Sequence, residues 1–124
     1  MTASRITQGD IFWLDDCPPL HGDVAKRRPV VVISPTSVVE TRPNILAVAC
    51  TSSTLPSDQT AIELPSRERT PQTKTGLNRR TWVVPRWLVP VERHLLVDYI
   101  GRVSGPTLRR ILEAVEASAG GMTD

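Results

Sequence analysis

The chain reads Pro29-Val30-Val31-Val32-Ile33-Ser34 at the point that decides its fold, and Pro35 ends this run. A nearly unbroken series of β-branched residues is typical of a strand buried on both faces. Residues 44–50, which read Asn-Ile-Leu-Ala-Val-Ala-Cys, form a second apolar run and predict a second buried strand. We therefore expect both strands in the middle of a sheet.

Further strand-forming segments lie on both sides of these two runs. Expected strands cover residues 9–14, 29–34, 44–50, 61–64, 81–84, 87–89 and 97–100, with one helical turn at 37–41. A loop is expected from Asp15 to Arg28, because Pro18 and Pro19 cannot extend a ladder. Pro85 and Pro90 predict bends or edges in the later strands.

From Ser104 the apolar period changes from that of a strand to that of a helix. Leu108, Ile111, Leu112 and Val115 share one helical face, with Ser104 as N-cap, Pro106 in the first turn and Gly120-Gly121 at the end. No alternation of strands and helices occurs, so a parallel α/β sheet is not expected. The sequence predicts a mainly β fold, a small and strongly bent antiparallel barrel of five to seven strands with a C-terminal amphipathic helix.

Length and composition limit the number of domains and the kinds of site that the protein can have. The 124 residues fit a single domain, with a core from about residue 8 to 118. No apolar stretch reaches signal-peptide or membrane-spanning length, which favours a cytoplasmic protein without membrane contact. Cys17 and Cys50 have no ligand-spaced neighbours, so we expect free buried thiols, no metal site and no cofactor.

The positive charge is concentrated in the second half of the chain. Residues 61–110 carry ten basic and four acidic side chains, although the formal net charge is only +2. Thirteen of the fifteen cations are arginine, which suits bidentate contacts to phosphate, although a GC-rich genome would also explain the excess. Residues 66–80, which include Arg79 and Arg80, have five cations against one acid and are expected to form a mobile, solvated loop. The clustering favours a polyanionic partner.

Two polar segments are candidates for a site. Lys26-Arg27-Arg28 precedes the first buried strand, where an arginine would be held on a rigid element with its head exposed, unless the triplet is simply a solvated loop. Thr51-Ser52-Ser53 ends the second buried strand and offers three hydroxyl donors, unless it is an ordinary turn. His21 lies in a loop, where a solvated histidine is the simpler interpretation. No nucleotide-binding, zinc or nucleophile-elbow motif is present.

These segments occur in an order that resembles the MazF/PemK/Kid toxins of type II toxin-antitoxin systems. The similar segments are Gln8-Gly9-Asp10-Ile11-Phe12-Trp13, Arg28-Pro29-Val30-Val31-Val32-Ile33-Ser34-Pro35, Ala49-Cys50-Thr51-Ser52-Ser53, Ile62-Glu63-Leu64-Pro65, Gly76-Leu77 and Ile100-Gly101-Arg102-Val103-Ser104. Each segment is weakly specific, but their collinear order from about residue 8 to 116 makes the resemblance strong.

The resemblance implies an SH3-like barrel, a homodimer and a metal-independent endoribonuclease that cuts single-stranded RNA at short motifs. Arg28 and Thr51 fall at the family's principal catalytic positions. Such cleavage uses the 2′-hydroxyl as nucleophile and leaves a 2′,3′-cyclic phosphate and a 5′-hydroxyl, so the protein must stabilise the phosphorane. Arg28 would neutralise it, although arginine is a poor general base because it stays protonated near neutral pH.

The remaining site residues are less closely matched to the family. Asp23 stands where the family commonly has a glutamate, a candidate base, and Arg86-Trp87 stands where many members have Asp-Gln. Trp87 would either stack on an RNA base or fill the core. RNA contacts are expected from His21, Lys26, Arg27, Ser52, Ser53, Arg79, Arg80, Arg86 and Trp87.

Two other functions fit the same fold. One is a gyrase poison that resembles CcdB, although the tail Ala119-Gly120-Gly121-Met122-Thr123-Asp124 lacks the aromatic and apolar end that this branch needs. The other is an RNA binder whose cleavage activity has decayed. The family resemblance also implies a cognate antitoxin with an acidic, partly disordered tail that lies across the basic groove. The 66–80 loop is expected to cover both the RNA and this tail.

Overall fold

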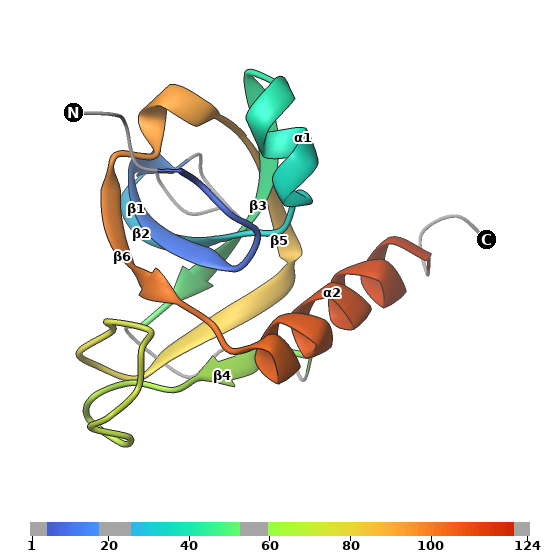
Figure 1. Ribbon diagram of the computed structural model, residues 1–124. Coiled ribbons are helices and arrows are strands. Elements are labelled where there is room, and N and C mark those ends of the chain that lie inside the picture. Colours follow the sequence, from blue (N-terminus) through green and yellow to red (C-terminus); the bar gives the residue numbers. More distant parts are fainter. Residues whose placement is uncertain (1–4, 18–25, 53–59, 121–124) are drawn as a thin grey trace.

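The computed structural model describes residues 5–17, 26–52 and 60–120. In chain order the elements are β1 (Asp10–Cys17), β2 (Lys26–Val32), α1 (Thr36–Thr41), β3 (Asn44–Thr51), β4 (Ile62–Leu64), β5 (Thr81–Glu92), η1 (Arg93–Leu95), β6 (Asp98–Arg102) and α2 (Gly105–Gly120). The six strands of these described segments form one antiparallel sheet in the order β4-β5-β3-β2-β1-β6. Figure 1 shows this sheet curled into a half-barrel, with α2 lying along its outside. The mainly β prediction with a C-terminal helix is confirmed.

The two predicted buried strands lie side by side as β2 and β3 in the middle of the sheet. Because side chains alternate along a strand, Val30 and Val32 face the interior of the curled sheet, whereas Val31 faces the outer layer beneath α2. All three are fully buried, because both faces of the sheet are covered at β2. This double coverage explains why the run shows no polar alternation.

Helix α2 covers the outer face of the sheet through one apolar stripe. Ile111 is fully buried, and Leu108, Leu112 and Val115 pack partly buried beside it. The Thr107 amide donates to Ser104 Oγ at 3.3 Å, as expected of an N-cap. In the part of the chain that the structure describes, no helix is long and apolar enough to cross a membrane.

The predicted loop from Asp15 to Arg28 is wrong at both ends. β1 continues to Cys17 and β2 begins at Lys26, so that Cys17 pairs with Lys26 and Leu14 with Arg28. A β-bulge between Leu14 and Cys17 lets the ladder continue past an irregular stretch. The basic triplet is therefore part of a strand, and residues 18–25 lie outside the described segments.

Strand β5 runs unbroken through both of its prolines. Its register against β3 shifts between the pairs Val48–Leu88 and Cys50–Val83, which places extra residues of β5 around Pro85. Such a bulge accommodates a residue without an amide hydrogen. The separate strands expected at 81–84 and 87–89 are therefore one bent strand.

Residues 66–80 form a loop whose residues are mostly exposed, as predicted, but three of its positions are buried. Ser66, Thr75 and Leu77 are buried, and the Thr75 hydroxyl donates to the Pro65 carbonyl at 2.6 Å. The Arg102 amide donates to the Lys74 carbonyl at 3.1 Å, which joins the loop to the end of β6. These few buried positions could not be predicted from the sequence, because charged residues dominate the segment.

Candidate active site

Arg28, near the start of β2, and Thr51, at the end of β3, lie close together on the two central strands. The β2–β3 ladder ends at the pair Val30–Ala49, two residues after Arg28 and two residues before Thr51, and both residues line one small cavity. Arg28 Nη1 donates to the Cys50 carbonyl at 3.3 Å, which fixes the guanidinium beside the end of β3. The two residues that the sequence singled out are therefore neighbours in space.

The Arg28 side chain is buried, contrary to the expectation of an exposed head. Only 5 % of the residue is accessible to solvent. Its guanidinium carbon lies 4.9 Å from the ring centre of Trp87, in cation–π geometry. Burial follows from the strand register, because Arg28 shares the inward face of β2 with Val30.

A small cavity of about 140 Å³ gathers several of the predicted polar residues at the start of β2 and the end of β3. It is lined by Trp13, Lys26, Arg27, Arg28, Pro29, Cys50, Thr51 and Ser52. Cations and hydroxyls thus surround one small volume, an arrangement suited to a phosphate group. We refer to it as the arginine–threonine cavity.

A second cavity of about 420 Å³ adjoins the first and shares Trp13, Pro29 and Ser52 with it. Its other lining residues are Gly76, Leu77, Asn78, Arg79, Thr81 and Ile100. Sequence reasoning singled out Arg79 but missed Trp13 and Asn78. Trp13 was detectable, because it alternates with Phe12 and Leu14 and so must face away from the inner core that holds both.

Arg27 is held by carboxylates and by an indole ring. Its Nε donates to Asp15 Oδ1 at 2.8 Å, and its Nη2 donates to Asp98. Its guanidinium carbon lies 4.7 Å from the ring centre of Trp13. These contacts fix the Trp13 ring at the boundary of the two cavities.

Several predicted contact residues lie elsewhere. Arg80 forms a bidentate ion pair with Glu63 at 2.8 and 3.0 Å and stacks on Trp82, and its hydrogen bonds lower the pKa of Glu63. Arg86 is exposed on β5 and lines neither cavity. Trp87 packs half-buried against the inner core, as the core interpretation expects. His21, Asp23 and Ser53 lie outside the described residues.

The two thiols are buried near the arginine–threonine cavity. Burial raises the pKa of Cys17, with a smaller opposing effect of the Arg28 charge. Burial also raises the pKa of Cys50 well above its usual range. Among residues 5–17, 26–52 and 60–120, no three His, Cys, Asp or Glu side chains are grouped so as to hold a metal ion.

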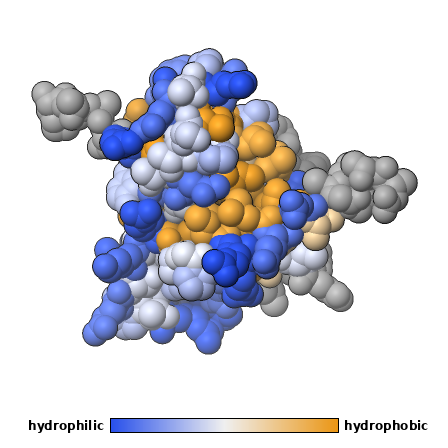
Figure 2. Space-filling view, turned by 45° about the vertical axis from the view of Figure 1, so that its right-hand side comes forward, coloured by the Kyte–Doolittle hydropathy of each residue, from blue (hydrophilic) through white to orange (hydrophobic). Residues whose placement is uncertain are grey.

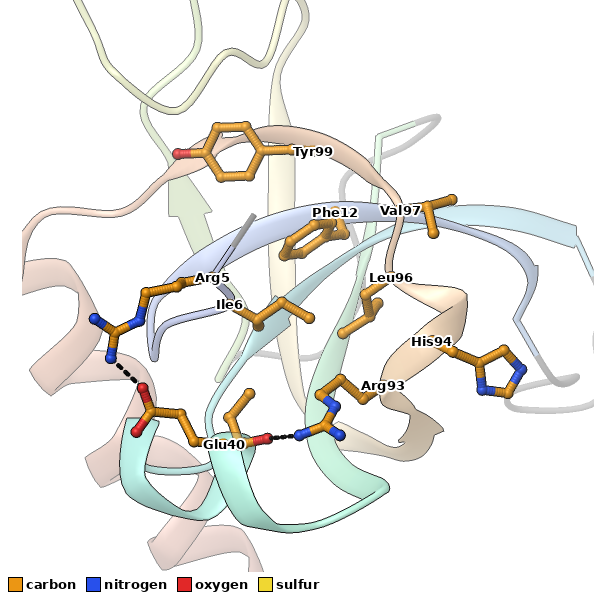
Figure 3. Close-up of a pocket in the computed structure, with 10 residues that line it drawn as sticks. Arg5, Ile6, Phe12, Glu40, Arg93, His94, Leu96, Val97 and Tyr99 are labelled. Carbon is orange, nitrogen blue, oxygen red and sulfur yellow. Dashed lines mark hydrogen bonds and ion pairs between the residues drawn. The ribbon is translucent and has the colours of Figure 1, made fainter. Parts of the chain in front are cut away.

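The largest of the described cavities, about 660 Å³, shares no lining residue with the arginine–threonine cavity. Figure 3 shows Phe12, Ile6 and Leu96 facing into it, with Tyr99 at one side. Arg5 is paired with Glu40, and Arg93 donates to the Val39 carbonyl. The guanidinium groups of this cavity are thus already bound to other groups of the protein. We assign the cavity no role in phosphate chemistry.

The chain is thus a small β-barrel protein, with a curled antiparallel sheet, a terminal helix, and an arginine and a threonine at the ends of its two central strands. The family model of the PemK-like, MazF-like toxin of type II toxin-antitoxin systems matches residues 7–119. The chain therefore belongs to this family of toxins.

Named relatives agree with this assignment. The chain is 29% identical over 107 residues to "Endoribonuclease MazF6" of Mycobacterium tuberculosis strain H37Rv, covering 86% of this chain and 90% of the relative. The same figures apply to "Endoribonuclease MazF2" of Mycobacterium bovis.

Solved structures share the fold. MazF from Deinococcus radiodurans superposes with a TM-score of 0.74 at 17% identity, covering 94% of this chain and 98% of that one. A mycobacterial endoribonuclease in complex with its cognate antitoxin superposes with a TM-score of 0.70 at 18% identity, covering 93% and 95%. At such identities the likeness shows the fold alone.

Proposed function

We propose that this toxin is a sequence-specific, metal-independent endoribonuclease that acts on single-stranded RNA in the cytoplasm. The observation that carries the proposal is that Arg28 and Thr51 both line the arginine–threonine cavity. The names of the mycobacterial relatives support the reaction class.

In the proposed reaction the 2′-oxygen of one nucleotide attacks the adjacent phosphorus and the 5′-oxygen of the next nucleotide leaves. The 2′-hydroxyl loses its proton and the leaving oxygen gains one, so the products are a 2′,3′-cyclic phosphate and a 5′-hydroxyl. Arg28 stabilises the charge that accumulates on the phosphorane, and its burial strengthens this interaction by excluding water. Thr51 donates to a non-bridging oxygen, and we propose Asp23 as the proton acceptor.

The test is RNA cleavage in EDTA by the wild type, Arg28→Ala and Thr51→Val. A matched control is Arg42→Ala, because Arg42 is an exposed arginine that lines neither cavity. We expect cuts at one short motif by the wild type and the control, and a loss of about 100-fold or more in Arg28→Ala. The new 5′ ends should accept phosphate from a polynucleotide kinase without prior treatment.

Two results would contradict the proposed reaction. One is an intact RNA after incubation with the wild type, and the other is cleavage that requires added Mg²⁺. DNA breaks without RNA cleavage after induction would instead support a gyrase poison. Binding without cleavage would indicate an RNA binder.

The family also implies partners. We propose that the toxin forms a homodimer and that an acidic segment of its antitoxin covers the arginine–threonine cavity. The cations that line both cavities support this, since an acidic segment would compete with RNA for them. An antitoxin peptide should therefore inhibit cleavage competitively.

A further inference from the structure

The second cavity begins where the arginine–threonine cavity ends. The two share Trp13, Pro29 and Ser52, so a phosphate in the smaller cavity places the neighbouring nucleotide at the mouth of the larger one. The larger cavity, at about 420 Å³, is within the usual range for small-ligand sites. Its position and size suit one nucleotide of a bound strand.

The lining of the second cavity combines flat apolar surface with a few polar groups. Trp13, Pro29 and Leu77 supply apolar walls, whereas Asn78 and Ser52 supply hydrogen-bonding groups. Unpaired RNA bases are recognised in this way, by stacking on an aromatic ring and by hydrogen bonds to the base edge. Arg79 adds an exposed cation for the backbone of the same nucleotide.

One wall of the cavity is fixed by a close approach of two backbones. A Cβ atom on Gly76 would lie 2.0 Å from the Ile100 carbonyl oxygen, and one on Gly101 would lie 2.2 Å from the Thr75 carbonyl oxygen. Gly76 also has a φ of +73°, a conformation that favours glycine. The segment that carries Asn78 and Arg79 is thus held against β6 before any ligand binds, as discrimination between bases requires.

The Trp13 ring is held by groups that do not need RNA. Arg27 covers one face of the indole and is itself anchored by Asp15 and Asp98. Arg27 is therefore a positioning residue for Trp13. Asn78 Oδ1 accepts a long hydrogen bond of 3.4 Å from Arg67, and no described residue accepts from the Asn78 amide nitrogen. That nitrogen is available to donate to a base.

We propose that the second cavity is a base-reading subsite for one unpaired nucleotide next to the scissile phosphate. The base stacks on the Trp13 face that Arg27 leaves uncovered, and Asn78 and Ser52 bond to its edge. The proposal rests on the proposed nuclease function and adds the place where one position of the cleavage motif is selected.

Cleavage of a randomised RNA pool by Asn78→Ala tests this assignment. We expect the preference at a single motif position to fall about tenfold or more, while the other positions keep their preference. The matched control is Asn44→Ala, because Asn44 is exposed at the start of β3, where it pairs with Glu92 and lines neither cavity. An unchanged motif, or an equal loss of rate on all sequences, overturns the proposal.

Trp13 variants provide a second measurement. Trp13→Leu should lower kcat/KM about tenfold to a hundredfold on the preferred RNA, and Trp13→Phe should recover most of it, because a phenyl ring still stacks. Thermal melting of each variant separates a lost subsite from a lost fold. If Trp13→Leu folds and cleaves like the wild type, the stacking assignment is wrong.

Binding separates failure of the subsite from failure of the proposed reaction. The probe is an RNA with a 2′-deoxy nucleotide at the cut site, or any unstructured RNA if no cut is found. It should quench the tryptophan fluorescence of the wild type more strongly than that of Trp13→Phe. Quenching without cleavage supports the subsite and contradicts the nuclease mechanism. Equal quenching in both proteins contradicts the subsite.

Discussion

Arg28 carries its charge in the interior of the protein, between the Cys50 carbonyl and the ring of Trp87. A buried cation without such partners would be costly, so the indole and the carbonyl make its position tolerable. They also prevent the guanidinium from folding away when no phosphate is bound. At the residue scale, neighbouring groups of the protein therefore hold Arg28 in place without a bound ligand.

Replacement of Trp87 tests this preparation. We expect Trp87→Leu to lower the free energy of unfolding by about 2 kcal/mol, since it leaves a partial cavity and removes the cation–π contact. RNA cleavage should fall at the same time, whereas Trp87→Phe should retain most of both. Urea denaturation and cleavage kinetics provide the measurements. Unchanged cleavage by a folded Trp87→Leu protein would show that Arg28 needs no such support.

The thiols give a second prediction at the residue scale. Burial raises the pKa of both Cys17 and Cys50, so little thiolate is present near pH 8 and access is restricted. We expect a thiol-specific reagent such as DTNB to react slowly with the native protein and to label two thiols once urea unfolds it. Fast labelling of the native protein would contradict the packing around β1 and β3.

At the element scale, the loop before β5 depends on two glycines that have no room for a side chain. We expect Gly76→Ala and Gly101→Ala each to destabilise the fold by about 2 kcal/mol or more, because the backbones must separate. Gly105→Ala is the control, since nothing lies within 4 Å of its added Cβ and alanine favours a helix. Thermal melting of the three variants measures the difference. Equal effects at all three positions would contradict the close approach.

The elements show how far sequence reasoning reaches. Periodicity predicted β2, β3 and α2 because each buries a continuous apolar stripe or run. It missed the paired ends of β1 and β2, since the bulge and the contacts of Arg27 with Asp15 and Asp98 are long-range effects. The same limit applies to the site. Arg28 and Thr51 were predicted, but the cavity that Trp13 shares with Asn78 depends on a loop whose charge made it look solvated.

At the scale of the whole molecule, the outer face of the sheet is only partly covered. Helix α2 packs against β5, yet Leu46 and Leu88, diagonal neighbours on the outer face of the β3–β5 ladder, remain about two-fifths exposed. Figure 2 shows apolar surface gathered beside α2 over these strands. Contiguous apolar surface of this kind is typical of an interface.

The proposed homodimer predicts that this face lies between the two protomers. We expect the wild type to sediment as a dimer and Leu46→Glu with Leu88→Glu to sediment as a monomer, because two buried carboxylates would face their copies across a symmetric contact. Leu95→Glu is the matched control, since Leu95 is 46% exposed on η1 and is not part of the β3–β5 ladder. If the wild type is monomeric, the homodimer is wrong. If the control dissociates the dimer and the double variant does not, the protomers meet on a different face.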